Sequence, residues 1–491
     1  MKIMMASSEA APFAKTGGLA DTVSSLSIAL AQLGHEVKIV IPRYYNIDRE
    51  ALEQTEGPLG VGTGGGEEWC AIYKTSLPGS PGKNTIEIFF VDHEKFFGRD
   101  GIYGTPSEPD FLDNPRRFSF FCRSVFQLCR KLRWEPDILH AHDWPSALVP
   151  VFLKFGEKFF PGFNNTKSVL TIHNLGYQGI YSKDNYWFTS LNWDVFGAAG
   201  FEDWNMMNLL KAGICCAGKL NTVSRRYAEE TKTQAQGFRL DGVLRYRSED
   251  YQGILNGIDT ELWNPAKDKF IPAPYSSKNM EGKAKAKEAL QKEFGLPGRA
   301  DVPIVGMINR LADQKGVGEL FGPGYGSAFS ICRDMDLQFV ILGAGENWCE
   351  NEIRSLSSRL SNFKAKIGYS EELSHLIEAG SDFFLMPSRY EPSGLNQMYS
   401  MVYGTLPIVR NTGGLADTVQ NYNQDSGGGT GFMFDDLNPS AIYNTVGWAI
   451  WAYYNRREDI EGMRIRGMNQ SFSWEISAKK YITMYEAALD A

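Results

Sequence analysis

Short runs of apolar residues recur along the first half of the chain, and longer segments of mixed polarity separate them. The runs are KIMMA (2–6), VKIVI (37–41), IEIFFV (86–91), DILHAH (137–142), SVLTIH (168–173) and LNTV (220–223). Apolar strands that alternate with amphipathic helices are typical of a mostly parallel sheet with helices on both faces. The first half is therefore predicted to be an α/β domain.

The same pattern restarts after a Pro-rich, polar stretch at 263–280 and a charged segment at 281–294 that predicts a helix. A second, doubly wound α/β domain is expected there. We place the two domains at residues 1–262 and 263–471. The apolar runs of the second domain are PIVGMIN (303–309), QFVIL (338–342), FKAKIG (363–368), DFFLM (382–386) and LPIVR (406–410).

A long helical pattern covers about 439–488 and is interrupted near 467–473. The interruption predicts a last helix, about 472–491, that crosses back to the first domain. Two segments do not fit the α/β pattern. The glycine-rich stretch 57–66 is expected to be a loop, and FGPGYG (321–326) interrupts an expected helix.

The octapeptide TGGLADTV occurs twice, at 16–23 behind Lys15 and at 412–419 behind Asn411. Each copy follows a predicted strand and leads into a predicted helix. Adjacent glycines let a backbone approach an anion closely, and a helix amino terminus offers unpaired N–H donors. A single Gly-Gly pair is more often a turn, but the repetition favours phosphate or sugar-phosphate binding. In open α/β sheets ligands bind at the carboxyl ends of the strands, so two such domains facing across a cleft would line one site.

Composition limits the possible partners and the compartment. The chain has 491 residues, 43% of them hydrophobic, and a net charge of −8, which argues against a general nucleic-acid or anionic-membrane surface. No apolar run reaches the roughly 18 residues of a membrane helix. The seven cysteines form no CxxC pair, which predicts free thiols in a reducing, cytoplasmic environment. No acidic cluster has metal-ligand spacing, so we expect neither a metal nor a cofactor.

The glycine loops lack two common nucleotide-binding signatures. A dinucleotide site requires GxGxxG after the first strand and an acidic residue after the second, whereas VKIVI is followed by Pro42 and Arg43. A GxxxxGK[ST] loop is also absent. A nucleotide-sugar or phosphosugar site remains.

Seven motifs together resemble the family of bacterial glycogen synthases and plant starch synthases. They lie in the family's order and span nearly the whole chain: KTGGLADTVSSL (15–26), HAHDW (140–144), TIHNLGYQG (171–179), ILNGID (254–259), NRLADQKG (309–316), EPSGLNQ (391–397) and NTGGLADT (411–418). The resemblance implies a GT-B fold of two Rossmann-like domains. It also implies transfer of glucose from ADP-glucose to the non-reducing end of an α-1,4-glucan, with retention of the anomeric configuration.

The resemblance assigns three cations to the donor diphosphate. Arg310 and Lys315, expected in the loop after PIVGMIN, match the family's diphosphate pair, and Lys15 matches the lysine of its first glycine loop. Fixed cations stabilise the negative charge that develops on a departing diphosphate. Arginine and lysine can thereby replace a divalent ion.

The resemblance assigns other residues to the glucose. His173 matches the family's sugar-contacting histidine, whose backbone carbonyl would face the anomeric carbon while its side chain reaches a hydroxyl. Glu391 matches the essential glutamate, expected to bind donor hydroxyls. Asp21 and Asn256 are expected to complete the contacts to the sugar.

Further contacts are expected around both substrates. Tyr369 is positioned to stack on the base. Backbone groups of the glycine loops and of a helix start are expected to bind the donor, at Gly17, Gly18, Gly394, Leu395, Thr412, Gly413 and Gly414. The glucan is expected to meet Glu9, Asp143 and Trp144, although Trp144 is also compatible with core packing.

Three other functions stay open. A glucan phosphorylase requires a lysine for pyridoxal phosphate, and the stretch 391–416 contains none. A transferase that uses another sugar nucleotide would share the charged residues of the second domain. A non-catalytic glucan-binding protein would tolerate their loss. The sequence leaves open the preference for ADP over UDP beyond the resemblance, the acceptor length, the product and the oligomeric state.

Overall fold

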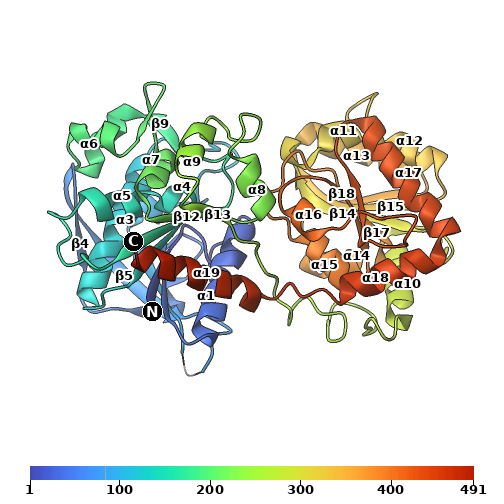
Figure 1. Ribbon diagram of the computed structural model, residues 1–491, viewed down its shortest axis with the longest axis horizontal. Helices are drawn as coiled ribbons and strands as arrows, with labels where there is room; N and C mark the ends of the chain where they lie inside the picture. The colour runs from blue at the N-terminus through green and yellow to red at the C-terminus, as the bar shows by residue number, and fades with distance from the viewer. Residues whose placement is uncertain (83) are drawn as a thin grey trace. The chain divides into compact units, whose positions relative to one another are not determined.

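The computed structural model describes residues 1–82 and 84–491, which form two compact units (Figure 1). The first unit contains Met1–Gly257 together with Trp474–Ala491, and the second contains Ile258–Ser473. These divisions lie close to the borders expected at 262 and 471. Each unit is an α/β structure built on its own sheet.

The sheet of the first unit has ten strands in the order β13-β12-β8-β7-β1-β2-β6-β5-β3, with β4 paired to β5, and its edge strand β3 is Glu53–Gln54. The strands from β13 to β6 pair in parallel, and each apolar run of the first half overlaps one of them, whereas the edge strand β13 has no predicted run. These strands are β1 (Lys2–Ala6), β2 (Glu36–Pro42), β6 (Glu87–Asp92), β7 (Ile138–His142), β8 (Lys167–Ile172), β12 (Lys219–Thr222) and β13 (Tyr251–Gly253).

One edge of this sheet is antiparallel. The glycine-rich stretch 57–66 was expected to be a loop, but that expectation is wrong, because it contains β4 (Leu59–Thr63), paired to β5 (Gly66–Ser76). Leu59, Val61 and Thr63 are buried while the glycines between them are half-buried. This alternation has the period of a strand. The glycines hide it in the sequence.

Helices cover both faces of the first sheet. They include α1 (Gly18–Gln32), α3 (Asn114–Lys131), α5 (Leu148–Phe155), α7 (Leu209–Cys216) and α8 (Arg225–Glu230). The last helix, α19 (Trp474–Leu489), lies beside α1 and also contacts β8 and β12 (Figure 1). The C-terminal segment is therefore part of the first unit.

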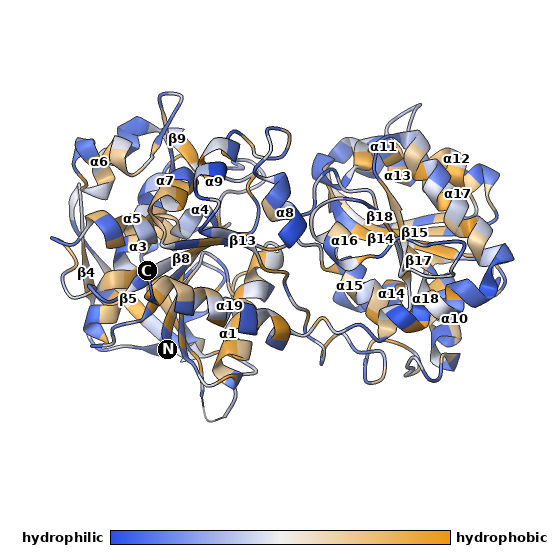
Figure 2. Cartoon of the chain, in the orientation of Figure 1, coloured by the Kyte–Doolittle hydropathy of each residue, from blue (hydrophilic) through white to orange (hydrophobic). Residues whose placement is uncertain are grey.

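The second unit is built on a six-stranded parallel sheet in the order β16-β15-β14-β17-β18-β19. The strands carry hydrophobic residues between the covering helices (Figure 2). All the predicted apolar runs are strands, and the sequence missed only the short β19. The strands are β14 (Ile304–Leu311), β15 (Gln338–Gly345), β16 (Phe363–Ile367), β17 (Phe383–Met386), β18 (Leu406–Arg410) and β19 (Phe432–Phe434).

The helices of the second unit follow the predicted interruptions. The segment 322–326 separates α11 (Val317–Phe321) from α12 (Ala328–Asp334), and α10 (Glu281–Phe294) has the expected bounds. The C-terminal pattern contains α17 (Pro439–Asn455) and α18 (Arg457–Met468) before α19. Within residues 1–82 and 84–491, no helix has the length and apolar character needed to cross a membrane.

Candidate functional site

Two of the predicted catalytic residues of the second unit form an ion pair. Lys315 ends a short 3-10 helix after β14, and Glu391 lies in the loop after β17. The Lys315 Nζ lies 2.6 Å from Glu391 Oε2, and the side chains are 19% and 8% exposed. Ser388 Oγ donates to the same carboxylate oxygen at 2.8 Å. The two loops therefore bring a cation and a nearly buried carboxylate together.

Arg389 connects the loop that carries Glu391 to the segment that carries Lys315. Its guanidinium donates to both carboxylate oxygens of Asp313 at 3.1 Å and to Glu319 Oε1 at 2.8 Å. Its backbone N–H also donates to the Gln314 carbonyl at 2.8 Å. Sequence reasoning missed Arg389, although a basic residue two positions before Glu391 was a signal. Its position in the fold makes it a support for Lys315.

Arg310 does not lie in the loop where it was expected. It belongs to β14 and pairs with Ala344 of β15, because both strands continue their parallel register as far as Leu311 and Gly345. Arg310 is exposed, and its guanidinium has no hydrogen-bond or ion-pair partner within residues 1–82 and 84–491. This cation is therefore accessible to an anion.

The second octapeptide packs tightly behind Glu391. Thr412, Gly413 and Gly414 are buried, and the Gly414 N–H donates to the Glu391 carbonyl at 2.9 Å. Gly413 has φ of +46°, and a Cβ there would lie 2.0 Å from the Glu391 carbonyl oxygen. A Cβ on Gly414 would lie 1.8 Å from the carbonyl oxygen of Ser393. These glycines are required by the contact between two loops, and the predicted phosphate contacts stay a prediction.

The remaining predicted residues of the second unit lie at loop and helix ends. Gly394 has φ of +64°, and Leu395 directly precedes α15 (Asn396–Val402). Tyr369 follows β16 and is 78% exposed, so its ring is available for stacking.

The first octapeptide has the opposite environment from the second. Thr16, Gly17 and Gly18 are exposed, and a Cβ on Gly17 would meet nothing within 4 Å. Glu9 is buried beneath this loop and accepts from the Thr16 N–H at 2.5 Å and the Thr16 Oγ1 at 2.8 Å. It also accepts from the Tyr103 hydroxyl at 2.6 Å. Glu9 therefore holds the glycine loop in place.

Lys15 and Asp21 form an exposed pair at the start of α1. Their charged atoms are 2.8 Å apart, and the side chains are 47% and 36% exposed. Such pairs contribute little stability, so either partner can turn to a ligand at low cost. Nearby, Asn256 Nδ2 donates to Thr22 Oγ1 at 3.1 Å. The buried Asn256 Oδ1 has no partner in the described part of the chain, which makes it a candidate hydrogen-bond acceptor.

Asp143 fixes the backbone of His173. The His173 N–H donates to Asp143 Oδ1 at 2.7 Å, and Asp143 itself has φ of +57°. Burial raises the pKa of Asp143 to about 7, although the backbone donors of His173 and Asn174 act in the opposite direction. A non-glycine residue in this conformation is a local strain of the kind found at functional sites.

The imidazole of His173 meets a second histidine that sequence reasoning missed. His173 Nε2 lies 3.1 Å from His142 Nδ1, and His140 lies two residues before His142 on β7. Burial lowers the pKa of His173 and of His140 to about 3. The signal was the alternation in HAHDW, since residues two apart on a strand share one face.

Trp144 packs inside the first unit. It is 7% exposed, and its ring lies 4.9 Å from that of Phe118 and 6.0 Å from that of Tyr103. A sugar ring could stack on Trp144 only after these rings move. The predicted acceptor contacts of Glu9, Asp143 and Trp144 therefore stay predictions.

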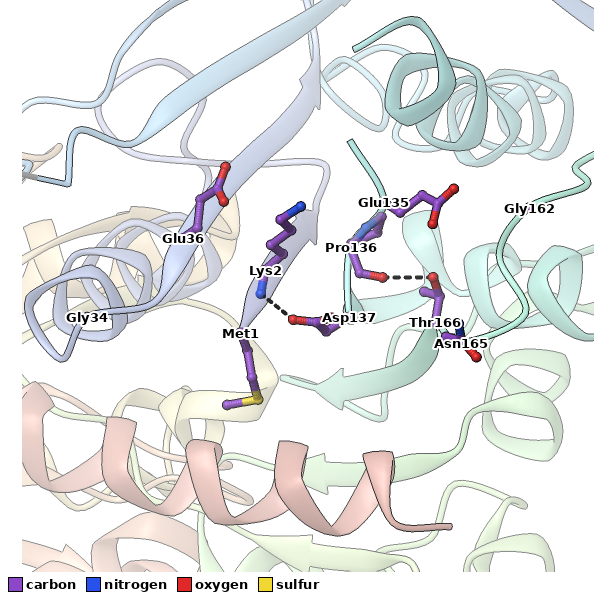
Figure 3. Close-up of a pocket in the computed structure, with 10 residues that line it drawn as sticks. All are labelled: Met1, Lys2, Gly34, Glu36, Glu135, Pro136, Asp137, Gly162, Asn165 and Thr166. Atoms are coloured by element: carbon purple, nitrogen blue, oxygen red, sulfur yellow. Dashed lines mark hydrogen bonds between the residues drawn. The ribbon is translucent and has the colours of Figure 1, made fainter. Parts of the chain in front are cut away.

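A cavity of about 450 Å³ lies at the amino-terminal edge of the first sheet (Figure 3). Lys2, Glu36, Glu135 and Asp137 contribute to its lining, and the Lys2 backbone N–H donates to Asp137 at 2.6 Å. Ligands of open α/β sheets bind at the carboxyl ends of strands, so this cavity is separate from the candidate site. In the described ranges, no group of three His, Cys, Asp or Glu residues is arranged to hold a metal ion.

Comparison with known proteins shows the family of both units. Residues 2–246 match the starch synthase catalytic domain, and residues 290–460 match the glycosyl transferases group 1 domain. The chain is 57% identical over 490 residues to a glycogen synthase of Treponema denticola, covering 100% of this chain and 99% of that protein. It is 43% identical to glycogen synthase 1 of Geobacter metallireducens, covering 100% and 96%.

A solved structure supports the same family relationship. The catalytic domain of starch synthase IV from Arabidopsis thaliana, bound to ADP and acarbose, superposes with a TM-score of 0.88 at 31% identity and covers 100% of this chain and 99% of that one. Two Rossmann-like units with these domains define a glycosyltransferase of the GT-B class. The chain belongs to the family of bacterial glycogen synthases and plant starch synthases.

Proposed function

We propose that the protein transfers glucose from ADP-glucose to the non-reducing end of an α-1,4-glucan, with retention of configuration. The observation that carries this proposal is the 57% identity with a glycogen synthase along the whole chain. The choice of ADP is supported by the starch synthase IV structure, which was solved with ADP.

The cations of the second unit act on the leaving diphosphate. Cleavage of the glycosyl–phosphate bond places negative charge on the departing oxygen, which prepositioned cations stabilise. Arg310 has no competing partner within the described residues, and Lys315 has three N–H donors, of which one serves Glu391. Lys315 can therefore bind a phosphate oxygen while it keeps its ion pair. Lys15 supplies a further cation from the first unit.

The sugar contacts come from acceptors and neutral groups. Positive charge develops on the sugar, so a neutral His173 suits its neighbourhood better than an imidazolium. Burial lowers the pKa of this histidine to about 3, which keeps it neutral at physiological pH. Glu391, Asp21 and the unpartnered Asn256 Oδ1 accept hydrogen bonds from glucose hydroxyls.

The other contacts are proposed from position. Backbone groups of Gly17, Gly18, Gly394, Leu395, Thr412, Gly413 and Gly414 lie beside the donor, and Tyr369 stacks on the adenine. The glucan contacts Glu9, Asp143 and Trp144 of the first unit, and it reaches Trp144 after the rings that cover this residue move. We also propose a cytoplasmic setting, which the seven free cysteines support.

The donor choice is tested by supplying the purified protein with glycogen and labelled ADP-glucose or UDP-glucose. We expect glucose incorporation with a higher kcat/KM for ADP-glucose. Equal or greater incorporation from UDP-glucose would refute the ADP assignment, and incorporation from neither donor would refute the transferase proposal.

A further inference from the structure

The contact between two neutral histidines decides which nitrogen of His173 carries its proton. His142 Nδ1 and His173 Nε2 lie 3.1 Å apart, so one of them donates and the other accepts. Burial lowers the pKa of both imidazoles far below the usual range, so each ring carries one N–H. Two arrangements are therefore possible.

In the first arrangement, His142 carries its proton on Nδ1 and donates to His173 Nε2. In the second, His173 donates from Nε2, and His142 must carry its own proton on Nε2. The His142 Nε2 atom is buried and has no hydrogen-bond partner within residues 1–82 and 84–491. A buried N–H without an acceptor costs more than a buried lone pair without a donor. The first arrangement is therefore favoured.

His140 cannot serve as the hydrogen-bond partner of His142 Nε2, because a neighbouring network occupies both of its ring nitrogens. Thr171 Oγ1 donates to Asn221 Oδ1 at 2.6 Å, so it accepts from His140 Nε2, also at 2.6 Å. His140 Nδ1 then accepts from the Tyr485 hydroxyl of α19 at 2.8 Å. Both nitrogens of His140 are thus occupied, although its ring lies only 4.1 Å from that of His142. The contact with His173 alone therefore determines which ring nitrogen of His142 carries the proton.

We propose that His142 is a positioning residue that holds His173 in the tautomer with its N–H on Nδ1. His173 Nδ1 has no partner among the described residues, so this N–H is left to donate to a ligand oxygen. The inference rests on the proposed function in one respect, namely that His173 contacts the donor sugar. On that basis, His173 donates to a glucose hydroxyl oxygen rather than accepting from the hydroxyl.

Nuclear magnetic resonance can read the tautomer without any activity assay. The full chain is prepared with ¹⁵N only in its six histidines, and the His173 signals are assigned by their loss in His173→Asn. We expect protonated Nδ1 and unprotonated Nε2 at neutral pH. A protonated Nε2 on His173 would overturn the inference. Because the tautomer is measured without substrate, the result does not depend on whether the proposed function is correct.

Two isosteric substitutions then test the positioning role. His142→Asn places an amide N–H near the position of Nδ1, whereas His142→Gln places it near Nε2. We expect His142→Asn to stay within about threefold of the unmodified kcat and His142→Gln to lose about tenfold, with similar KM values for the donor. Equal losses in both variants would contradict the role. If either variant does not fold, the tautomer of the unmodified protein still decides.

Discussion

Lys315 forms an ion pair with Glu391, a second predicted catalytic residue, and its loss is expected to slow turnover strongly. Lys315→Ala should lower kcat by about 10²–10³-fold, because it removes a cation from the leaving diphosphate and leaves Glu391 without its partner. Steady-state kinetics with ADP-glucose measure this. The control is Lys267→Ala, which breaks an exposed Lys–Glu pair with Glu261 and should leave kcat unchanged. A folded Lys315→Ala variant with ordinary kcat would remove Lys315 from the mechanism.

A substitution of Arg310 should change catalysis without changing stability. Its guanidinium has no partner within residues 1–82 and 84–491, so Arg310→Ala breaks no ion pair there. The melting temperature should therefore stay unchanged while kcat falls by about 10²-fold or more. Calorimetry and kinetics on the same sample measure both quantities. An unchanged kcat would show that this cation does not act on the diphosphate.

The two octapeptides predict opposite outcomes for the same substitution. Gly413→Ala should destabilise the second unit by about 1–3 kcal/mol or more, since φ is +46° and the new Cβ would meet the Glu391 carbonyl. Gly17→Ala is the matched control, because its φ is −163° and a Cβ there has open space. Thermal unfolding measures the difference. A Gly413→Ala variant as stable as Gly17→Ala would contradict the packing.

The sequence predicts the role of an individual residue only where that residue belongs to a motif or to the family resemblance. Lys315 and Glu391 were predicted from family motifs, and the structure brings them together. The different roles of Gly17 and Gly413 could not be predicted, because identical octapeptides acquire different surroundings from distant loops. His142 was missed for a similar reason, since its partner His173 comes from a distant part of the chain, directly after the neighbouring strand β8.

At the scale of elements, apolar runs predicted the parallel strands because these strands are buried on both faces. The pattern failed for β4, where glycines occupy the alternate positions of an edge strand. It also placed Arg310 in a loop, because polar residues at the end of β14 end the apolar run before the hydrogen-bonded register ends.

A buried carboxylate joins three elements of the second unit. Asp382 precedes β17, and its oxygens lie 2.8 Å from Lys287 Nζ of α10 and 2.5 Å from Arg464 Nη2 of α18. Asp382→Asn leaves the buried Lys287 without a counterion and leaves Arg464 only its ion pair with the partly exposed Glu461. We expect it to lower the free energy of unfolding of this unit by about 3–5 kcal/mol. Urea unfolding measures the loss, and Asp334→Asn, which breaks an exposed pair with Arg333, should leave the midpoint unchanged.

The same carboxylate predicts a pH dependence. Burial alone raises the pKa of Asp382, but Arg464 and Lys287 outweigh burial and lower it below the usual value. Its stabilising effect is therefore complete above the ordinary pKa of an aspartate and is lost as the pH falls through the lowered pKa. Unfolding midpoints from pH 7 into the acid range, compared between the unmodified protein and Asp382→Asn, should converge. A constant difference at all pH values would contradict this linkage.

At the scale of the whole molecule, catalysis is expected to need no divalent ion. The described ranges contain no group of three His, Cys, Asp or Glu residues arranged for a metal, whereas Arg310 and Lys315 supply positive charge. Glucose transfer should therefore persist after treatment with EDTA and removal of the chelator. Loss of activity that magnesium restores would contradict a mechanism based on these cations.

The most direct test of the account is the product formed from ADP-glucose and a short maltooligosaccharide of defined length. Mass spectrometry and ADP release should show one ADP for each glucose added, and β-amylase should release the added glucose as half of a maltose, as expected for an α-1,4 bond at the non-reducing end. ADP release without elongation, or an added glucose that β-amylase does not release in maltose, would contradict the proposed retaining transfer.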